Sequence, residues 1–231
     1  MDPLDRPDRP PARPAFLDRP SDRAQGPDLV SHPDLLESEP WDEERAPGGV
    51  PYWLGEMLNY CSRCGEALRF GPLAGDHRER LACPACGFVA YVNPRLVVTT
   101  LPITEADEVV LLRRGIPPGY GAWAQPGGFL EVDETVREGA IRETLEETGL
   151  VVEPGEIVGL YSRTQAAIVV VAFEAHIVGG ELHTNPEALG FGTFSAEAIP
   201  WEGLAFKTTQ WALRDWVRRR HPELHPELVR D

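Results

Sequence analysis

The chain has 231 residues, which is enough for one ordinary domain and a small additional module. Its formal net charge of −15 argues against a nucleic-acid-binding protein, because affinity for phosphate backbones comes mainly from Lys and Arg. The Pro- and Asp-rich start lacks the apolar core of a secretory signal, and no apolar run is long enough to span a membrane. We therefore expect a cytoplasmic protein with no membrane partner.

Residues 1–50 are rich in Pro, Asp and Arg, and their apolar residues stand alone. Such a segment buries too little apolar surface to offset the entropy lost on ordering. We expect a disordered tail here, and we favour a solvated extension over a partner-binding segment.

Residues 58–92 contain two CxxC pairs, and 18 residues separate the pairs. Each pair reverses the chain so that two thiolates face one ion. Four thiolates suit a tetrahedral zinc ion and leave no open position for water or substrate. The spacing therefore predicts a small ribbon with one structural Zn²⁺, held by Cys61, Cys64, Cys83 and Cys86.

Small four-cysteine ribbons also bind nucleic acids or mediate dimerisation. Between the two pairs, the basic side chains are balanced by acidic ones, so no basic stripe forms. We therefore expect a small nucleotide as the partner rather than a nucleic acid, and the sequence leaves a homodimer open.

Residues 93–220 have the pattern of a globular α/β domain. The last predicted strand opens with an unbroken, β-branched apolar run, which is typical of a strand buried on both faces. We expect strands at 96–103, 109–113, 157–162 and 167–178, and helices at 135–148 and 207–220.

The most informative segment is the predicted helix at 135–148. Glu143, Glu146 and Glu147 have the spacing i, i+3, i+4, which places their carboxylates on one helical face. Like charges at this spacing destabilise a helix and raise one another's pKa, and a divalent cation relieves the repulsion. Oxygen ligands at this density suit Mg²⁺ or Mn²⁺. A solvated acidic helix is the alternative interpretation.

Both ends of this helix are specified. Thr135 and Glu138 form a capping box, and Gly149 suits a left-handed C-terminal position. We expect the opposite face to pack on a sheet through Val136, Gly139, Ala140 and Leu145.

The pattern Gly128-x5-Glu134-x7-Arg142-Glu143-Thr144-Leu145-Glu146-Glu147-Thr148-Gly149-Leu150 resembles the box that defines Nudix hydrolases, at all seven fixed positions. Thr144 stands where that family usually has an aliphatic residue. Together with the cysteine ribbon, the stretches 90–95, 121–132 and 199–206 resemble zinc-ribbon Nudix hydrolases, including plant chloroplast enzymes that cleave FAD and ADP-ribose.

The resemblance implies an α/β/α sandwich around a mixed sheet. It also implies hydrolysis of the pyrophosphate bond in a nucleoside diphosphate conjugate, with FAD or ADP-ribose favoured, by two or three Mg²⁺ or Mn²⁺ ions. By position, Glu143 and Glu147 would bind metal, Glu146 would bind or support it, and Arg142 would orient the glutamates. The Gly127 carbonyl matches a ligand of the family. Glu131 could contact a metal as it does in some relatives, or it could be a surface acid. Glu134 could support the end of the helix rather than take part in the chemistry.

A late segment departs from the family. Many relatives have a further catalytic glutamate in a PExxExRxF pattern, whereas here Glu187 is followed by Gly190 and Gly192 in place of the second acid and the arginine. We carry Glu187 as a candidate catalytic residue, with ordinary loop acidity as the alternative. Three aromatics, Trp123, Phe129 and Tyr161, are candidates for stacking on a base, although aromatics beside buried strands more often belong to the core.

Two other functions compete with the favoured hydrolase. Residues 160–167 read LYSRTQAA where NADH-cleaving relatives have a motif close to SQPWPFP, which counts against an NADH pyrophosphatase. A nucleotide-sensing regulatory protein with weak or no catalysis is the other alternative. The complete box favours an enzyme, whereas Gly190 is the best argument for a regulator.

Overall fold

The computed structural model describes residues 58–224, so the predicted tail at 1–50 lies outside the described residues. The cysteine module forms a small antiparallel sheet in the order β1–β2–β3. Its strands are β1 (Arg69–Pro72), β2 (Glu79–Ala82) and β3 (Val89–Ala90). Within the described part of the chain, no helix is long and apolar enough to cross a membrane.

The second sheet is mixed, and five of its strands run in the order β10–β5–β4–β9–β8. The central pair β4–β9 is parallel, whereas the other pairs are antiparallel. The short strands β6 and β7 pair with β5 and β4 respectively. The bounds are β4 (Arg95–Ile103), β5 (Val109–Arg114), β6 (Trp123–Ala124), β7 (Gly127–Phe129), β8 (Leu150–Arg163), β9 (Ile168–Gly180) and β10 (Ala188–Phe194).

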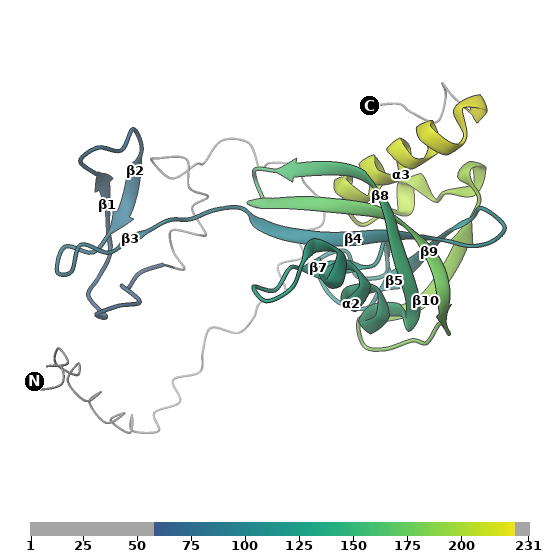
Figure 1. The fold of residues 1–231 in the computed structure, drawn as a ribbon, viewed down its shortest axis with the longest axis horizontal. Coiled ribbons are helices and arrows are strands. Elements are labelled where there is room, and N and C mark those ends of the chain that lie inside the picture. Colours follow the sequence, from purple (N-terminus) through teal and green to yellow (C-terminus); the bar gives the residue numbers. More distant parts are fainter. Residues whose placement is uncertain (1–57, 225–231) are drawn as a thin grey trace, which may run out of the picture.

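Two helices cover opposite faces of this sheet, as Figure 1 shows. The helix α3 (Lys207–Arg220) packs Leu213 and Trp216 into the largest apolar cluster, with Leu101 and Leu111 of the sheet. The helix α2 (Val136–Thr148) packs its buried Ala140 on the other face. Because successive side chains of a strand point to opposite faces, β4 and β9 each supply both clusters. Three single-turn helices complete the described part of the chain: η2 (Ala196–Ala198), η3 (Trp201–Gly203) and η4 (Pro222–Leu224).

This arrangement confirms the predicted α/β/α sandwich with a mixed sheet. The strand β9 is central, and Val170–Phe173 are buried on both faces, as the apolar run indicated. The strand β8 begins at Leu150 rather than at Ile157, directly after α2. The strand β10 was not predicted, because its sequence ALGFGTF contains two glycines and no long apolar run.

The predicted packing face of α2 was wrong at one position. Leu145 is 45% exposed, whereas Thr144 is fully buried. The face that meets the sheet follows Ala140, Thr144 and Thr148, which are spaced by four residues. The Thr144 hydroxyl is satisfied there by the Ala140 carbonyl and by the Thr100 hydroxyl of β4, each at 2.7 Å. A threonine is therefore accommodated where an aliphatic residue is usual, because β4 supplies a matching hydroxyl.

Candidate metal centre and active site

The two CxxC turns bring the cysteine sulfurs together, each Sγ within 4.8 Å of the others. The separations are 3.6 Å for Cys61–Cys86, 3.4 Å for Cys64–Cys83 and 3.5 Å for Cys64–Cys86. A tetrahedral site with Zn–S bonds of about 2.3 Å separates its sulfurs by about 3.8 Å. The predicted thiolate set therefore fits one tetrahedral Zn²⁺.

The same backbone hydrogen bonds close both turns. The Gly65 N–H donates to the Cys61 carbonyl at 2.9 Å, and the Gly87 N–H donates to the Cys83 carbonyl at 3.0 Å. The first cysteine of each pair is buried, and the second is exposed. The repeated CxxCG sequence thus gives two equivalent turns that face each other across the cluster.

In the larger domain, both ends of α2 are fixed as the sequence predicted. At the N-terminus, the Thr135 N–H donates to Glu138 Oε2 at 2.8 Å, and the Glu138 N–H donates to Thr135 Oγ1 at 3.3 Å. At the C-terminus, Gly149 has a left-handed φ of 80°, and its N–H donates to the Leu145 carbonyl. This capping box and this C-terminal glycine set the rotation at which α2 presents its carboxylates.

The loop residues Gly127 and Gly128 lie directly beside two of these carboxylates. The Gly127 N–H donates to Glu147 Oε2 at 2.7 Å. A Cβ at Gly128 would lie 2.4 Å from Glu143 Oε2, so the carboxylate needs a residue without a side chain at this position. A Cβ at Gly127, where φ is 151°, would lie 2.2 Å from the Val98 carbonyl oxygen. The paired glycines therefore let the loop backbone meet Glu143 and Glu147.

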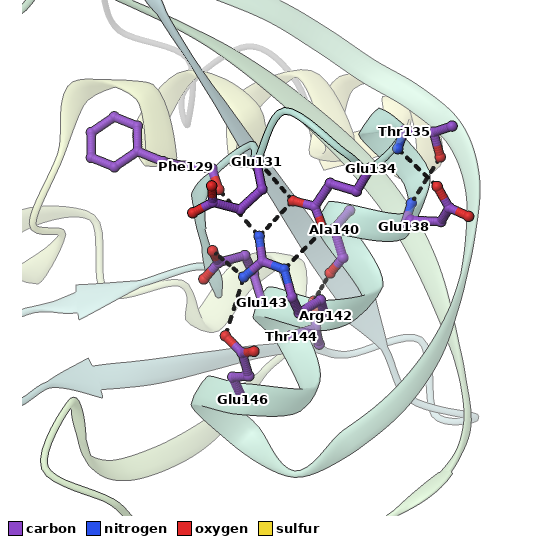
Figure 2. Close-up of polar contacts among 10 residues, drawn as sticks. All are labelled: Phe129, Glu131, Glu134, Thr135, Glu138, Ala140, Arg142, Glu143, Thr144 and Glu146. Atoms are coloured by element: carbon purple, nitrogen blue, oxygen red, sulfur yellow. Dashed lines mark hydrogen bonds and ion pairs between the residues drawn. The ribbon is translucent and has the colours of Figure 1, made fainter. Parts of the chain in front are cut away.

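Arg142 connects this loop to the helix, as Figure 2 shows. Its guanidinium donates twice to Glu134, at 2.6 and 2.9 Å, and once to the Phe129 carbonyl at 3.2 Å. It also donates to Glu143 Oε1 at 2.7 Å and to Glu146 Oε2 at 3.2 Å. These hydrogen bonds lower the pKa of Glu134 to about 2, with a further contribution from the backbone N–H of Glu131. Arg142 and Glu134 thus fix the loop and two of the box carboxylates.

Glu147 is the most deeply placed of the three box glutamates, with only 7% of the residue exposed. Burial raises the pKa of its carboxyl to about 7, although the hydrogen bond from Gly127 opposes this rise. Burial also raises the pKa of Glu143, against the effect of Arg142. A buried carboxylate is costly unless a cation or hydrogen bonds compensate it. Oxygen donors in such a place fit a hard divalent cation such as Mg²⁺ or Mn²⁺.

The three box carboxylates do not converge on one point. Glu143 and Glu147 face the glycine loop, whereas the Glu146 side chain is 59% exposed and bound to Arg142. Among residues 58–224, the cysteines are the only group of three or more potential ligands within 4.8 Å of one another. Glu143 and Glu147 therefore contact the glycine loop, whereas Glu146 lies outside this contact and pairs with Arg142.

A second set of charged groups lies near the C-terminal end of α2. Arg114, at the end of β5, is half buried, and burial lowers its pKa while the nearby Glu147 and Glu187 raise it. Its Nε donates to the Pro118 carbonyl at 2.8 Å, and its guanidinium lies 4.9 Å from the Phe206 ring. The candidate Glu187 is therefore close enough to Arg114 and Glu147 to raise the pKa of each slightly.

Sequence reasoning missed Arg114. The signal that could have identified it is the pair of cations, Arg113 and Arg114, that follows the buried run Val109–Leu112 and so marks the end of a core strand.

The three aromatic candidates have different surroundings. Tyr161 is buried among the residues that pack against α3, and its hydroxyl donates to Asp215 at 2.8 Å, so its ring does not face a ligand site. Phe129 is 44% exposed, and the Arg95 guanidinium lies 4.2 Å from its ring. Trp123 packs edge-on against Phe194 at 5.2 Å and lines a cavity of about 590 Å³. That cavity is also lined by Arg113, Tyr120, Gly121, Ala122, Glu202, Gly203 and Leu204.

Comparison with known proteins agrees with this geometry. A family model described as NUDIX domain matches residues 93–219, and one described as Nudix N-terminal, a zinc ribbon, matches residues 59–92. An ADP-ribose pyrophosphatase of Methanocaldococcus jannaschii is 31% identical over 132 residues, which are 55% of this chain and 76% of that protein.

Two further relatives extend the match. The NAD-capped RNA hydrolase NudC of Pseudomonas aeruginosa is 31% identical over 146 residues, which are 61% of this chain but only 49% of that protein. The chain thus spans about half the length of this second relative. A crystal structure of a NUDIX hydrolase from Nitrosomonas europaea has a TM-score of 0.66 and 32% identity, over 73% of this chain and 95% of that chain.

Proposed function

The chain belongs to the Nudix hydrolase family, whose members act on pyrophosphate bonds, and we propose that it cleaves ADP-ribose or a similar nucleoside diphosphate conjugate such as FAD. The products would be two monophosphates. The observation that carries the proposal is the convergence of the Glu143 and Glu147 side chains on the Gly127–Gly128 backbone. ADP-ribose is named first because an ADP-ribose pyrophosphatase is among the relatives.

The metal ligands in this proposal are Glu143, Glu147 and the Gly127 carbonyl, with Glu146 in support. When bound, Mg²⁺ or Mn²⁺ would neutralise phosphate oxygens and lower the pKa of a coordinated water molecule. Arg142 would keep Glu143 and Glu146 in place through its hydrogen bonds. The free cysteines suit a reducing compartment, and we propose the cytoplasm.

Two other side chains have roles in this proposal. Glu187 is the candidate to accept a proton from the attacking water, because it lies near Glu147 and is exposed to solvent. Arg114 is the nearby cation that would contact a phosphate.

The test is a substrate panel. Purified protein is incubated with Mg²⁺ or Mn²⁺ and separately with ADP-ribose, FAD and NADH, and the products are separated by chromatography. We expect metal-dependent release of AMP from ADP-ribose and loss of release in Glu147→Gln. Equal cleavage by the variant and the wild type would contradict the site assignment. Binding without cleavage of any substrate would favour the regulatory alternative.

A further inference from the structure

We propose that Asn185 is a positioning residue that holds the turn carrying Glu187 against the C-terminal end of α2, beside Glu147. This inference rests on the proposed function, because it assigns Asn185 a role in the same site. The side chain lies in the loop between β9 and β10, far from the box in sequence, and its amide makes hydrogen bonds on both sides.

The carbonyl groups in the last turn of α2 need hydrogen-bond donors from outside the helix. The last four carbonyls of a helix lack partners within the helix. Here Gly149 N–H donates to Leu145 O, and His183 N–H donates to Thr148 O at 3.1 Å. The two carbonyls between them both accept from the Asn185 side chain: Nδ2 lies 3.1 Å from Glu146 O and 3.0 Å from Glu147 O. Asn185 therefore completes the cap of the helix at the two box glutamates.

The oxygen of the same side-chain amide binds the turn that carries Glu187. Asn185 Oδ1 accepts from the N–H of Glu187 at 2.8 Å and from the N–H of Ala188 at 2.9 Å. The backbones of Asn185 and Ala188 also exchange hydrogen bonds, at 3.1 and 3.2 Å. With two donor and two acceptor contacts, the amide uses its full hydrogen-bonding capacity. Its two ends join the turn of Glu187 to the backbone of Glu147.

The turn that carries Glu187 is also held by the end of β5. The Gly115 N–H, directly after Arg114, donates to the Glu187 carbonyl at 2.7 Å. A Cβ at Gly115 would lie 2.1 Å from the Pro186 carbonyl oxygen, so the turn lies against the end of β5. On the side of α2, the loop is otherwise joined to the helix only by the described hydrogen bond of His183 with Thr148, which precedes the turn. Asn185 supplies the connection of the turn itself to α2 and thereby sets the placement of Glu187 relative to Glu147.

The test is a double-mutant cycle on metal-dependent hydrolysis of ADP-ribose. Asn185→Ala is made in the wild type and in Glu187→Gln, with Thr184→Ala, an exposed neighbour in the same loop, as the matched control. We expect Asn185→Ala to lower kcat about 10- to 100-fold in the wild type, as loss of an outer partner does, and to change kcat by less than about 2-fold in Glu187→Gln. Thr184→Ala should leave both backgrounds unchanged.

Measurements of thermal stability distinguish the positioning of Glu187 by Asn185 from a role in helix capping alone. The loss of the helix cap should lower the melting temperature equally in both backgrounds, whereas the loss of kcat should depend on Glu187. Equal losses of kcat in the two backgrounds, or no loss in the wild type, would overturn the inference and leave the proposed function standing.

A second measurement does not depend on activity. Amide hydrogen exchange in Asn185→Ala should be faster at Glu187, whose N–H loses its acceptor, whereas the Ala188 N–H keeps the Asn185 backbone carbonyl. Unchanged exchange would also overturn the inference. Faster exchange in a protein that cleaves no substrate would support the placement and would contradict the proposed function instead.

Discussion

At the scale of single residues, the carboxyl group of Glu147 carries the largest electrostatic cost in the site. Its pKa is raised from 4.5 to about 7 in the folded protein, mainly by burial. The folded state therefore binds this proton more tightly than the unfolded chain does. The corresponding stability is fully present below the unfolded pKa and is lost as the pH rises through about 7.

Glu147→Gln should consequently stabilise the metal-free protein at high pH. Glutamine keeps an oxygen that accepts from the Gly127 N–H but never ionises. At about pH 8, the gain in the free energy of unfolding should be on the order of 3 kcal/mol, and it should vanish at about pH 4. Urea unfolding at the two pH values measures it. Added Mg²⁺ should reduce this difference, because the wild type binds the ion more tightly and gains more stability.

Arg142 is the other residue on which the site geometry depends. Lysine has one ammonium in place of the planar guanidinium, so it cannot reproduce the paired hydrogen bonds to Glu134 together with those to Glu143 and Glu146. Arg142→Lys should therefore lower kcat/KM about 10- to 100-fold, nearly as much as Arg142→Ala. Steady-state hydrolysis of ADP-ribose measures both variants. Full activity of the lysine variant would show that charge alone suffices.

The sequence predicted the identity of these residues better than their surroundings. The spacing i, i+3, i+4 predicted that Glu143, Glu146 and Glu147 share one face of a helix, and all three lie in α2. It did not show that Glu147 is buried while Glu146 is exposed, because burial depends on how the glycine loop and the loop before β10 approach the helix. The role of Asn185 was likewise hidden, since its contacts lie 38 and 39 residues away in sequence.

At the scale of secondary-structure elements, α2 and β4 meet through a buried pair of hydroxyl groups. Thr144 and Thr100 are both fully buried, and their Oγ1 atoms lie 2.7 Å apart. The strand β4 also pairs with β7, which carries Gly127. The contact between the two hydroxyl groups therefore helps to fix the distance between α2 and the glycine loop.

The two hydroxyl groups should be coupled in stability. Thr144→Val leaves the Thr100 hydroxyl buried without this partner, which should cost about 1–3 kcal/mol of unfolding free energy. Thr100→Val together with Thr144→Val should cost clearly less than the sum of the single substitutions, because two apolar groups of similar shape replace the pair. Denaturant titration of the four proteins measures this. Simple additivity would show that the two side chains do not act as a pair.

The long, regular elements were predictable and the short ones were not. Local periodicity and caps were sufficient for α2, α3, β4, β5 and most of β9. The strands β6, β7 and β10 consist of a few residues or contain glycines, and they exist because they pair with β4 or β5. Such long-range pairing has no local signature, so the sheet edge beside the site appears only in the structure.

At the scale of the whole molecule, the zinc ribbon and the proposed metal site of the hydrolase domain differ in their ligands. Four thiolates complete a tetrahedral site, whereas Mg²⁺ bound by one or two carboxylates usually keeps several water molecules as ligands. The purified protein should therefore contain about one zinc per chain, and dialysis against Mg²⁺ should not remove it. Elemental analysis measures the content. A fully folded protein without zinc would contradict the ribbon assignment.

The central claim is that the carboxylates of α2 bind a divalent cation at the Gly127–Gly128 loop. Titration with Mn²⁺, followed by the electron paramagnetic resonance signal of free Mn²⁺, tests it without a substrate. The wild type and Glu153→Gln, which changes an exposed acid on β8, should lower the free signal equally. Glu147→Gln and Glu143→Gln should bind at least about 10-fold more weakly. Undiminished binding by both of these variants would contradict the account.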